Sequence, residues 1–282
     1  MLGITRRSIV VAAGVLAAAF LAIQPAAFAQ DASTGQSAPD LPKASQTTTP
    51  PPAEPPKPDP VEEAAYKTFF DSSSGKPDVE IQLGEAFVAK YPSSKYDESV
   101  YARLTQAYLT ENKLDKMYAA GDKALALNPD DATVLVIIGW TIPHNYDPND
   151  MDADRKLDKA EGYEKHAIVL LGAMAKPAAM TDDEFAKAKN SALSQAHAGL
   201  GLVYFRRGDY DNSVKELTLS EQLASQPDPT DFFVMGVDLQ QQKKFSEAAD
   251  AFTKCANIPG GFVDRCKQMA DQAKKSAASQ PK

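Results

Sequence analysis

Few of the residues that usually build catalytic and metal sites occur in this 282-residue sequence. The histidines are His144, His166 and His197, and none has a second candidate ligand four residues away or a CxxC pair nearby. Gly-x-Ser-x-Gly turns and Walker-type phosphate loops are absent, as are paired carboxylates in a strand context. Gly199-Leu200-Gly201 follows no strand, so we interpret it as helix packing. The sequence therefore predicts a protein that is not an enzyme and needs no cofactor.

Basic stretches with interleaved aromatic residues, which are typical of nucleic-acid binding, are missing as well. The formal net charge is −8 at pH 7, and phosphate backbones and anionic lipid surfaces repel an acidic chain. We therefore expect no nucleic acid among the partners. Strand-like alternation is also absent, whereas apolar residues recur at helical spacing from Val61 onward. This pattern predicts an all-α fold.

The first 29 residues have the layout of a cleavable export signal. A basic start at Arg6 and Arg7 precedes an apolar run over residues 9–23 and an Ala-Phe-Ala sequence at 27–29. The run is shorter than the roughly 20 residues that span a bilayer, so we expect no membrane insertion after cleavage. The arginines fit both an ordinary basic start and a twin-arginine signal. The predicted location is periplasmic or secreted.

Residues 30–60 are predicted to form an extended, disordered linker. Nine of the 20 prolines lie between Pro39 and Pro60, with almost no large apolar residues among them. Such a segment has fixed φ angles and nothing to bury, so it does not form a core. At ~3.1 Å per residue in the polyproline conformation, the proline-rich part would reach about 70 Å. We expect residues 61–275 to be folded and residues 276–282 to be a disordered tail.

A pattern recurs along the folded part at intervals of about 34 residues. Gly201 and Gly236 are 35 residues apart, and the same frame finds Thr105 and Gly139 as small residues, with Pro129 closing one unit. The pattern resembles the tetratricopeptide repeat (TPR), whose helix pairs carry a small residue in the first helix and a proline at the end of the second. The resemblance implies an α-α superhelical solenoid of about four to five helix pairs, a fold that binds proteins. A helix over 262–277 is expected to cap it.

Two segments refine this resemblance. Tyr91-Pro92-Ser93 resembles the junction found in TPR proteins of bacterial envelopes, where proline removes a backbone donor and serine caps the next helix. The interval from Gly139 to Gly201 is 62 residues long, so the second full repeat, 132–190, is lengthened. Its extra length falls in an acidic loop and in a helix that a Thr181/Glu184 capping box opens and that continues to Arg207. Pro143 is expected to stop the helix before the loop.

The acidic loop, residues 150–161, has the spacing of an EF-hand calcium loop. Its candidate oxygen ligands are Asp150, Asp152, Asp154, Asp158 and Glu161. Arg155, however, stands where the calcium loop needs glycine for its sharp turn. Two interpretations are open, a calcium site and a set of carboxylates that cap and charge a helix start, and the second is favoured.

Cys255 and Cys266 are the only cysteines. Exported proteins meet oxidising conditions, so a structural disulfide is the favoured interpretation and two buried thiols are the alternative. Closing so short a loop would contribute roughly 3 kcal/mol. No activating motif surrounds either residue, which argues against a redox role.

The TPR resemblance also implies a partner-binding groove, because the first helices of such repeats line the concave face. The residues just after the small positions, and those one turn further on, are expected to face it. These are Gln106, Leu109, Trp140, Leu202, Phe205, Val237 and Gln240. The alternative for Trp140 is a core position covered by the lengthened repeat.

The sequence thus favours an exported, non-enzymatic scaffold that binds a peptide segment or another envelope protein. Two alternatives are a calcium-dependent structural module and a self-associating assembly subunit, which would form homo-oligomers.

Overall fold

The computed structural model describes residues 59–73 and 75–280, which form eleven α-helices and no strand. The predicted all-α fold is therefore confirmed. The export signal and most of the predicted linker, residues 1–58, lie outside the described residues, as do 281–282. The helices are α1 Pro60–Ser73, α2 Pro77–Lys90, α3 Asp97–Thr110, α4 Leu114–Leu127, α5 Ala132–His144, α6 Ala153–Ala173, α7 Asp182–Arg207, α8 Tyr210–Leu223, α9 Pro229–Gln241, α10 Phe245–Ala256 and α11 Val263–Ala278.

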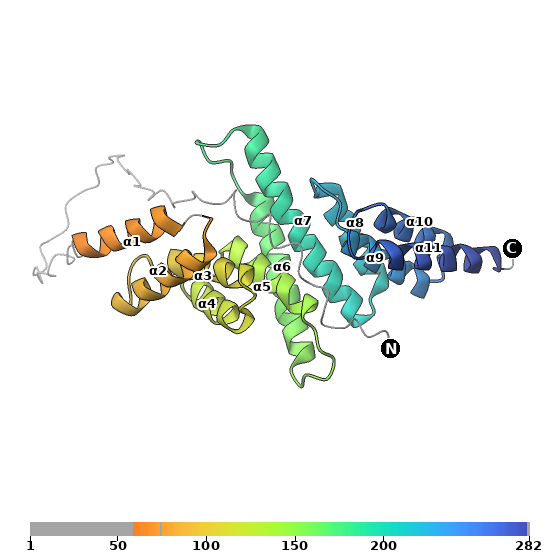
Figure 1. Ribbon diagram of the computed structural model, residues 1–282, viewed down its shortest axis with the longest axis horizontal. Coiled ribbons are helices and arrows are strands. Elements are labelled where there is room, and N and C mark those ends of the chain that lie inside the picture. Colours follow the sequence, from red (N-terminus) through yellow and green to blue (C-terminus); the bar gives the residue numbers. More distant parts are fainter. Residues whose placement is uncertain (1–58, 74, 281–282) are drawn as a thin grey trace, which may run out of the picture.

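The helices form an elongated row of consecutive pairs (Figure 1). Each helix packs against the next one in the chain, and α3 also contacts α5, α5 contacts α7, and α7 contacts α9. The first helices of successive pairs therefore lie next to one another, as expected of a solenoid. The long helices α6 and α7 cross the row and project beyond it (Figure 1). Among the described helices, none has both the length and the apolar character needed to cross a membrane.

The glycines of the repeat frame mark the closest approaches between paired helices. A Cβ atom added to Gly201 would lie 2.7 Å from Leu217 Cγ, and one added to Gly236 would lie 2.5 Å from Phe252 Cε1. Contacts this short do not occur in real packing, so only glycine fits. The frame that the sequence shows is thus the set of positions at which a second helix presses on the first.

Caps define the ends of the longest helix. The Thr181 side chain accepts a hydrogen bond from the Glu184 backbone, and the Glu184 carboxylate accepts one from Thr181 N at 3.0 Å, which completes the predicted capping box. At the other end Gly208 adopts φ 76°, a left-handed conformation that favours glycine and ends the helix. Helix α7 accordingly has the bounds that the sequence predicts.

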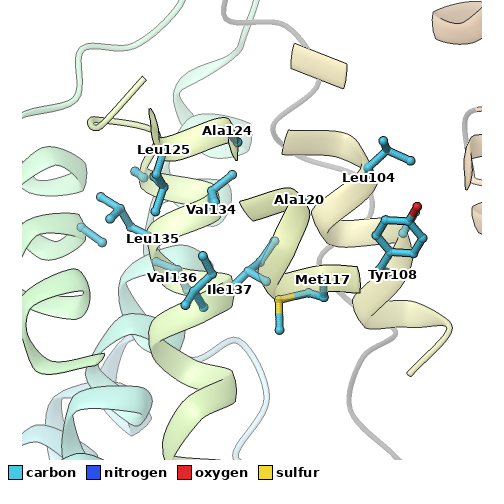
Figure 2. Packing of buried hydrophobic residues seen from close by; sticks show 14 of the residues in the cluster. Leu104, Tyr108, Met117, Ala120, Ala124, Leu125, Val134, Leu135, Val136 and Ile137 are labelled. Atoms are coloured by element: carbon cyan, nitrogen blue, oxygen red, sulfur yellow. The ribbon is translucent and has the colours of Figure 1, made fainter. Parts of the chain in front are cut away.

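The core consists of two clusters of buried side chains that meet at α7. The first runs from Phe69 in α1 to Val203 in α7, and Figure 2 shows its centre around Met117, Leu135 and Ile137. The second runs from Leu202 to Ala273 in α11. Adjacent residues of α7 thus belong to different clusters, and this helix joins the two halves of the core.

Two expected boundaries are wrong. Helix α5 does not stop before Pro143 but continues through it to His144. Side chains satisfy the last carbonyls there: His144 Nδ1 lies 2.7 Å from Trp140 O, and Asn145 Nδ2 donates to Thr141 O at 2.9 Å. Similarly, α11 extends to Ala278, three residues into the predicted disordered tail. The Gln280 side chain then donates to Lys243 O at 3.1 Å, which fastens this end to the preceding pair.

Candidate functional site

The seven residues predicted to line a groove occupy equivalent positions on four consecutive first helices. Six of them are half-buried, whereas Leu202 is buried at 3 % exposure. Since these helices contact one another in order, the structure gives the set a continuous scaffold. The residues are Gln106 and Leu109 on α3, Trp140 on α5, Leu202 and Phe205 on α7, and Val237 and Gln240 on α9.

Trp140 lies at the contact between α5 and α7. Its ring centroid is 3.7 Å from that of His144, and its Cα would be 3.1 Å from a Cβ atom on Gly199. The side chain is half-buried and belongs to neither core cluster. Trp140 is thus only partly covered, which favours the groove interpretation over the core one.

Sequence reasoning missed His144, Tyr146 and Arg206, which lie at the same end of α5 as Trp140 or just beyond it. Arg206 Nε donates to Pro143 O at 3.0 Å, and its guanidinium lies 5.6 Å from the ring centroids of both Tyr146 and Phe205. We call Trp140, His144, Tyr146, Phe205 and Arg206 the aromatic cluster. In the sequence, only the position of Arg206 directly after Phe205, a predicted groove residue, could have indicated that it belongs to the site. A guanidinium held over aromatic rings has a fixed orientation, which suits recognition of carboxylates and carbonyl oxygens.

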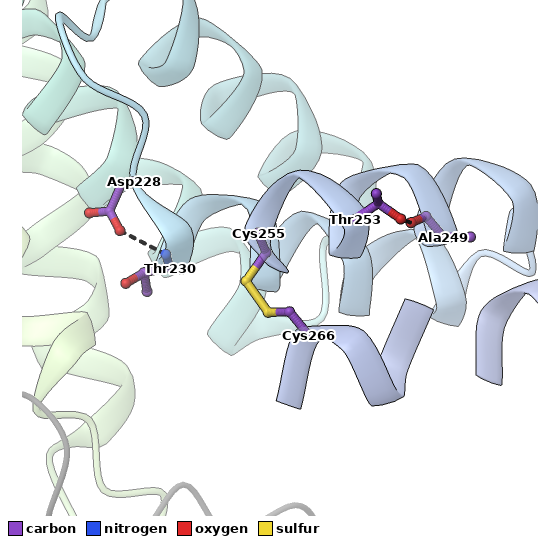
Figure 3. The surroundings of a disulfide bond; sticks show 6 residues. All are labelled: Asp228, Thr230, Ala249, Thr253, Cys255 and Cys266. Carbon is purple, nitrogen blue, oxygen red and sulfur yellow. Dashed lines mark hydrogen bonds between the residues drawn. A yellow bond between two sulfur atoms is a disulfide. The ribbon is translucent and has the colours of Figure 1, made fainter. Parts of the chain in front are cut away.

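The ionisation of this region is set by burial and by nearby carboxylates. Burial lowers the pKa of His144 to about 4, and the charge of Asp228 opposes that shift. Asp228 caps α9 by accepting from Thr230 N at 2.7 Å (Figure 3). Its own backbone N donates to Glu221 at 3.0 Å, and burial raises the pKa of Glu221 to about 7. At neutral pH His144 is therefore uncharged, while Arg206 carries the positive charge of the cluster.

The fold was compared with known protein families, curated proteins and solved structures. No protein-family model and no curated protein matches the sequence. Among solved structures, MamA of strain AMB-1 superimposes with a TM-score of 0.50 at 16% identity, over 71% of this chain and 99% of MamA. The chain has the tetratricopeptide-repeat fold. A thermophilic TPR protein of Thermus thermophilus (15% identity, 76% of this chain, 99% of that chain, TM-score 0.42) and the P58(IPK) TPR domain (15%, 76%, 65%, 0.32) are more distant.

The acidic loop of this TPR chain does not have the geometry of a calcium site. Helix α6 begins at Ala153, so Asp154, Asp158 and Glu161 are spread along a helix instead of facing inward from a loop. Glycine is missing at the turn position, which Arg155 occupies, and the chain continues as a helix there. No group of three or more His, Cys, Asp or Glu side chains within residues 59–73 and 75–280 is arranged to hold a metal ion.

The same carboxylates instead form ion pairs. Asp150 pairs with Lys156, and Asp152 lies 2.6 Å from Arg155. Asp158 lies 2.5 Å from Arg207, which also pairs with Glu161. The last turn of α7 is thus held against α6. Asp152 lies at the N-cap position of α6, and Asp154 puts a negative charge in its first turn, as the capping interpretation expects. The Asp152 side chain, however, makes no capping hydrogen bond.

The other candidate residues have structural partners. The Cys255 and Cys266 sulfur atoms lie 1.99 Å apart, at disulfide distance, between α10 and α11 (Figure 3). His166 Nε2 lies 3.0 Å from Asp130, and His197 Nδ1 lies 2.7 Å from Glu216. None of these side chains converges with others on a common point, which leaves the aromatic cluster as the candidate site.

One buried group was not anticipated from the sequence. Glu164 on α6 is fully buried, and neither carboxylate oxygen has a hydrogen-bond partner among the described residues. Its carboxyl group lies against the backbones of Gly139 and Gly199, where an added Cβ would be 2.7 Å and 2.2 Å away. Burial raises its pKa well above the usual value. The glycine outside the repeat frame, Gly199, was the only signal of this slot.

Proposed function

We propose that this TPR protein is an exported, non-enzymatic scaffold that binds a peptide segment or another envelope protein along its first helices. The fold supports protein partners in general. The observation that carries the proposal is the half-exposed aromatic cluster where α5 and α7 meet, because tryptophan, tyrosine and arginine are the residues that most often dominate interface energetics.

The cluster favours an extended peptide over a compact ligand. Trp140 and Phe205 offer flat apolar contact, whereas Gln240, on the neighbouring first helix α9, offers an amide group to a peptide backbone. Arg206 supplies a charged donor close to Phe205. A partner with an apolar anchor and a nearby carboxylate would match these groups.

Affinity capture tests the binding surface. Wild-type protein and a Trp140→Ala variant would be used as bait in envelope extract, with Lys267→Ala, at an exposed position of α11, as the matched control. We expect Trp140→Ala to weaken binding of a specific partner about 30-fold, the effect of a hot spot worth ~2 kcal/mol, and Lys267→Ala to leave it unchanged. Equal recovery of every partner by all three baits would remove Trp140 from the site.

Export is tested separately by fractionating a bacterium that expresses the full chain. Mature protein that begins at Gln30 in the periplasm or medium would support the proposed signal, and uncleaved cytoplasmic protein would contradict it. Replacing Arg6 and Arg7 by lysines distinguishes the routes, because a twin-arginine signal depends on both arginines. Light scattering of the mature protein tests the self-associating alternative, which a strict monomer would exclude.

A further inference from the structure

A groove of about 260 Å³ lies between α2, α3 and α4, and none of its lining residues belongs to the aromatic cluster. It occupies the side of α3 that α1 leaves free: Tyr66 in α1 bonds Ser99 at 3.0 Å, whereas Tyr101 and Tyr108 line the groove. Figure 2 shows Tyr108 with Leu104, one turn apart on α3. We call this the tyrosine groove; its lining residues are Glu85, Val88, Tyr101, Leu104, Tyr108, Lys116, Ala119, Ala120 and Lys123.

Each tyrosine of the groove has a charged neighbour. Lys123 Nζ lies 4.9 Å from the centroid of the Tyr101 ring, and Lys116 Nζ lies 5.5 Å from that of Tyr108. Tyr108 also donates to Glu85 at 2.6 Å. One end of the groove therefore carries a lysine alone, and the other carries a lysine and a carboxylate above an apolar floor.

The spacing of the tyrosines matches a polyproline helix. Tyr101 and Tyr108 are seven residues apart on one face of α3, which corresponds to roughly 10 Å along the helix axis. One turn of polyproline helix, three residues at ~3.1 Å each, is about 9 Å long. Grooves lined by aromatic rings bind proline-rich segments because such segments are already extended and lose little conformational entropy.

The chain carries such a segment directly before α1. Pro50-Pro51-Pro52 is followed by Ala53, Glu54 and Pro55. The segment joins α1 at Pro60, beside the turn that leads into α3: Lys95 lies 3.1 Å from Glu63, and the Tyr66 and Tyr96 rings stack at 3.9 Å. Tyr101 is about one turn further along α3.

The residues between the triple proline and α1 give the segment its reach. From Pro52 to Asp59 the chain can span about 22 Å at ~3.1 Å per residue. This length exceeds the roughly 8 Å of helix axis between Tyr96 and Tyr101, so the segment can extend toward the Tyr101 end of the groove. Because the segment is tethered, its effective concentration at the groove is in the millimolar range, which favours this occupant over free peptides.

We propose that residues 50–58 of this same chain bind in the tyrosine groove, with the triple proline against the half-buried Tyr101 ring and the exposed edge of Tyr108, which is otherwise buried at 5 % exposure, and with Glu54 beside Lys123. The lining residues of the groove on α3 lie on another face of that helix than Gln106 and Leu109, and binding there does not depend on the proposed scaffold function.

A fluorescent peptide of residues 42–60 tests this proposal by anisotropy. It would be titrated into the chain from Gln30 onward and into a variant of that chain in which Pro50, Pro51, Pro52 and Pro55 are replaced by serine. We expect the serine variant to bind the peptide at least ten-fold more tightly, because the wild-type groove is already occupied. A peptide with alanine at the same four positions is the control. Equal binding to both proteins, or no binding to either, would overturn the proposal.

The site and the occupant are tested by two further variants, each checked for helix content. Adding Tyr101→Ala to the serine variant should abolish peptide binding, whereas Tyr210→Ala on α8 should not. Lys123→Glu in the protein should weaken binding of the wild-type peptide. A peptide that carries Glu54→Lys should bind this variant again, because the charges are then exchanged. If neither the Tyr101 nor the Lys123 substitution changed peptide binding, the peptide would bind outside the tyrosine groove. Light scattering must show a wild-type monomer; an oligomer that dissociates in the serine variant would assign the groove to a second copy and refute intramolecular binding.

Discussion

At the scale of single residues, Glu164 is the group whose environment conflicts most with its charge. Its carboxyl group is buried without a partner, and burial raises its pKa. A carboxyl group whose pKa is raised in the folded state does not destabilise the protein while both states are protonated. As pH rises above the unfolded pKa of about 4.3, the free energy of unfolding decreases, because the unfolded state ionises more readily than the folded state. We expect Glu164→Gln to leave the free energy of unfolding nearly unchanged near pH 4 and to increase it at pH 7.5. Urea unfolding at both pH values measures this.

Glu161, one turn earlier on α6, is the matched control. Burial raises its pKa, but hydrogen bonds from Lys165 and Arg207 lower it by more, so the net shift is downward. Its charge therefore stabilises the fold above the unfolded pKa, and that contribution is lost as pH falls. Glu161→Gln should destabilise the protein at pH 7.5 and have little effect near pH 4. The same pH dependence in both variants would contradict this account, because it would mean that the ionised Glu164 carboxylate has a stabilising partner, as Glu161 has.

At the scale of helices, the contact between α7 and α8 depends on Gly201. A Cβ atom there would lie 2.7 Å from Leu217 Cγ and 3.3 Å from Leu217 backbone N, so the helices would have to separate. We expect Gly201→Ala to reduce the free energy of unfolding by about 1–3 kcal/mol, the usual effect of overpacking. A Cβ atom at Gly162, an exposed position of α6, would meet nothing within 4 Å, so Gly162→Ala should stabilise by up to ~1 kcal/mol. Urea unfolding curves compare the two, and equal effects would contradict the packing role.

Local signals in the sequence were sufficient for the helix pairs but not for the site. The glycine frame and the Thr181 capping box act within a few residues, so they predicted the repeats and the bounds of α7. The aromatic cluster and the α6–α7 ion pairs join residues far apart; Arg207 and Asp158, for example, are 49 positions apart. Such pairings depend on how the lengthened repeat packs, which no local pattern specifies. The ion pairs of the acidic loop were missed for the same reason, because its carboxylates pair with cations on α6 and α7.

At the scale of the whole molecule, the two core clusters meet at α7, and a solenoid transmits destabilisation mainly between neighbouring repeats. The Cys255–Cys266 pair links α10 to α11, within the second cluster. Replacing both cysteines by serine should destabilise this end by roughly 3 kcal/mol, the chain-entropy value for so short a loop. In hydrogen exchange, amides of α9–α11 should lose protection while those of α1–α5 keep theirs. Uniform loss along the chain would instead show that the two clusters unfold as one cooperative unit and that α7 couples them fully.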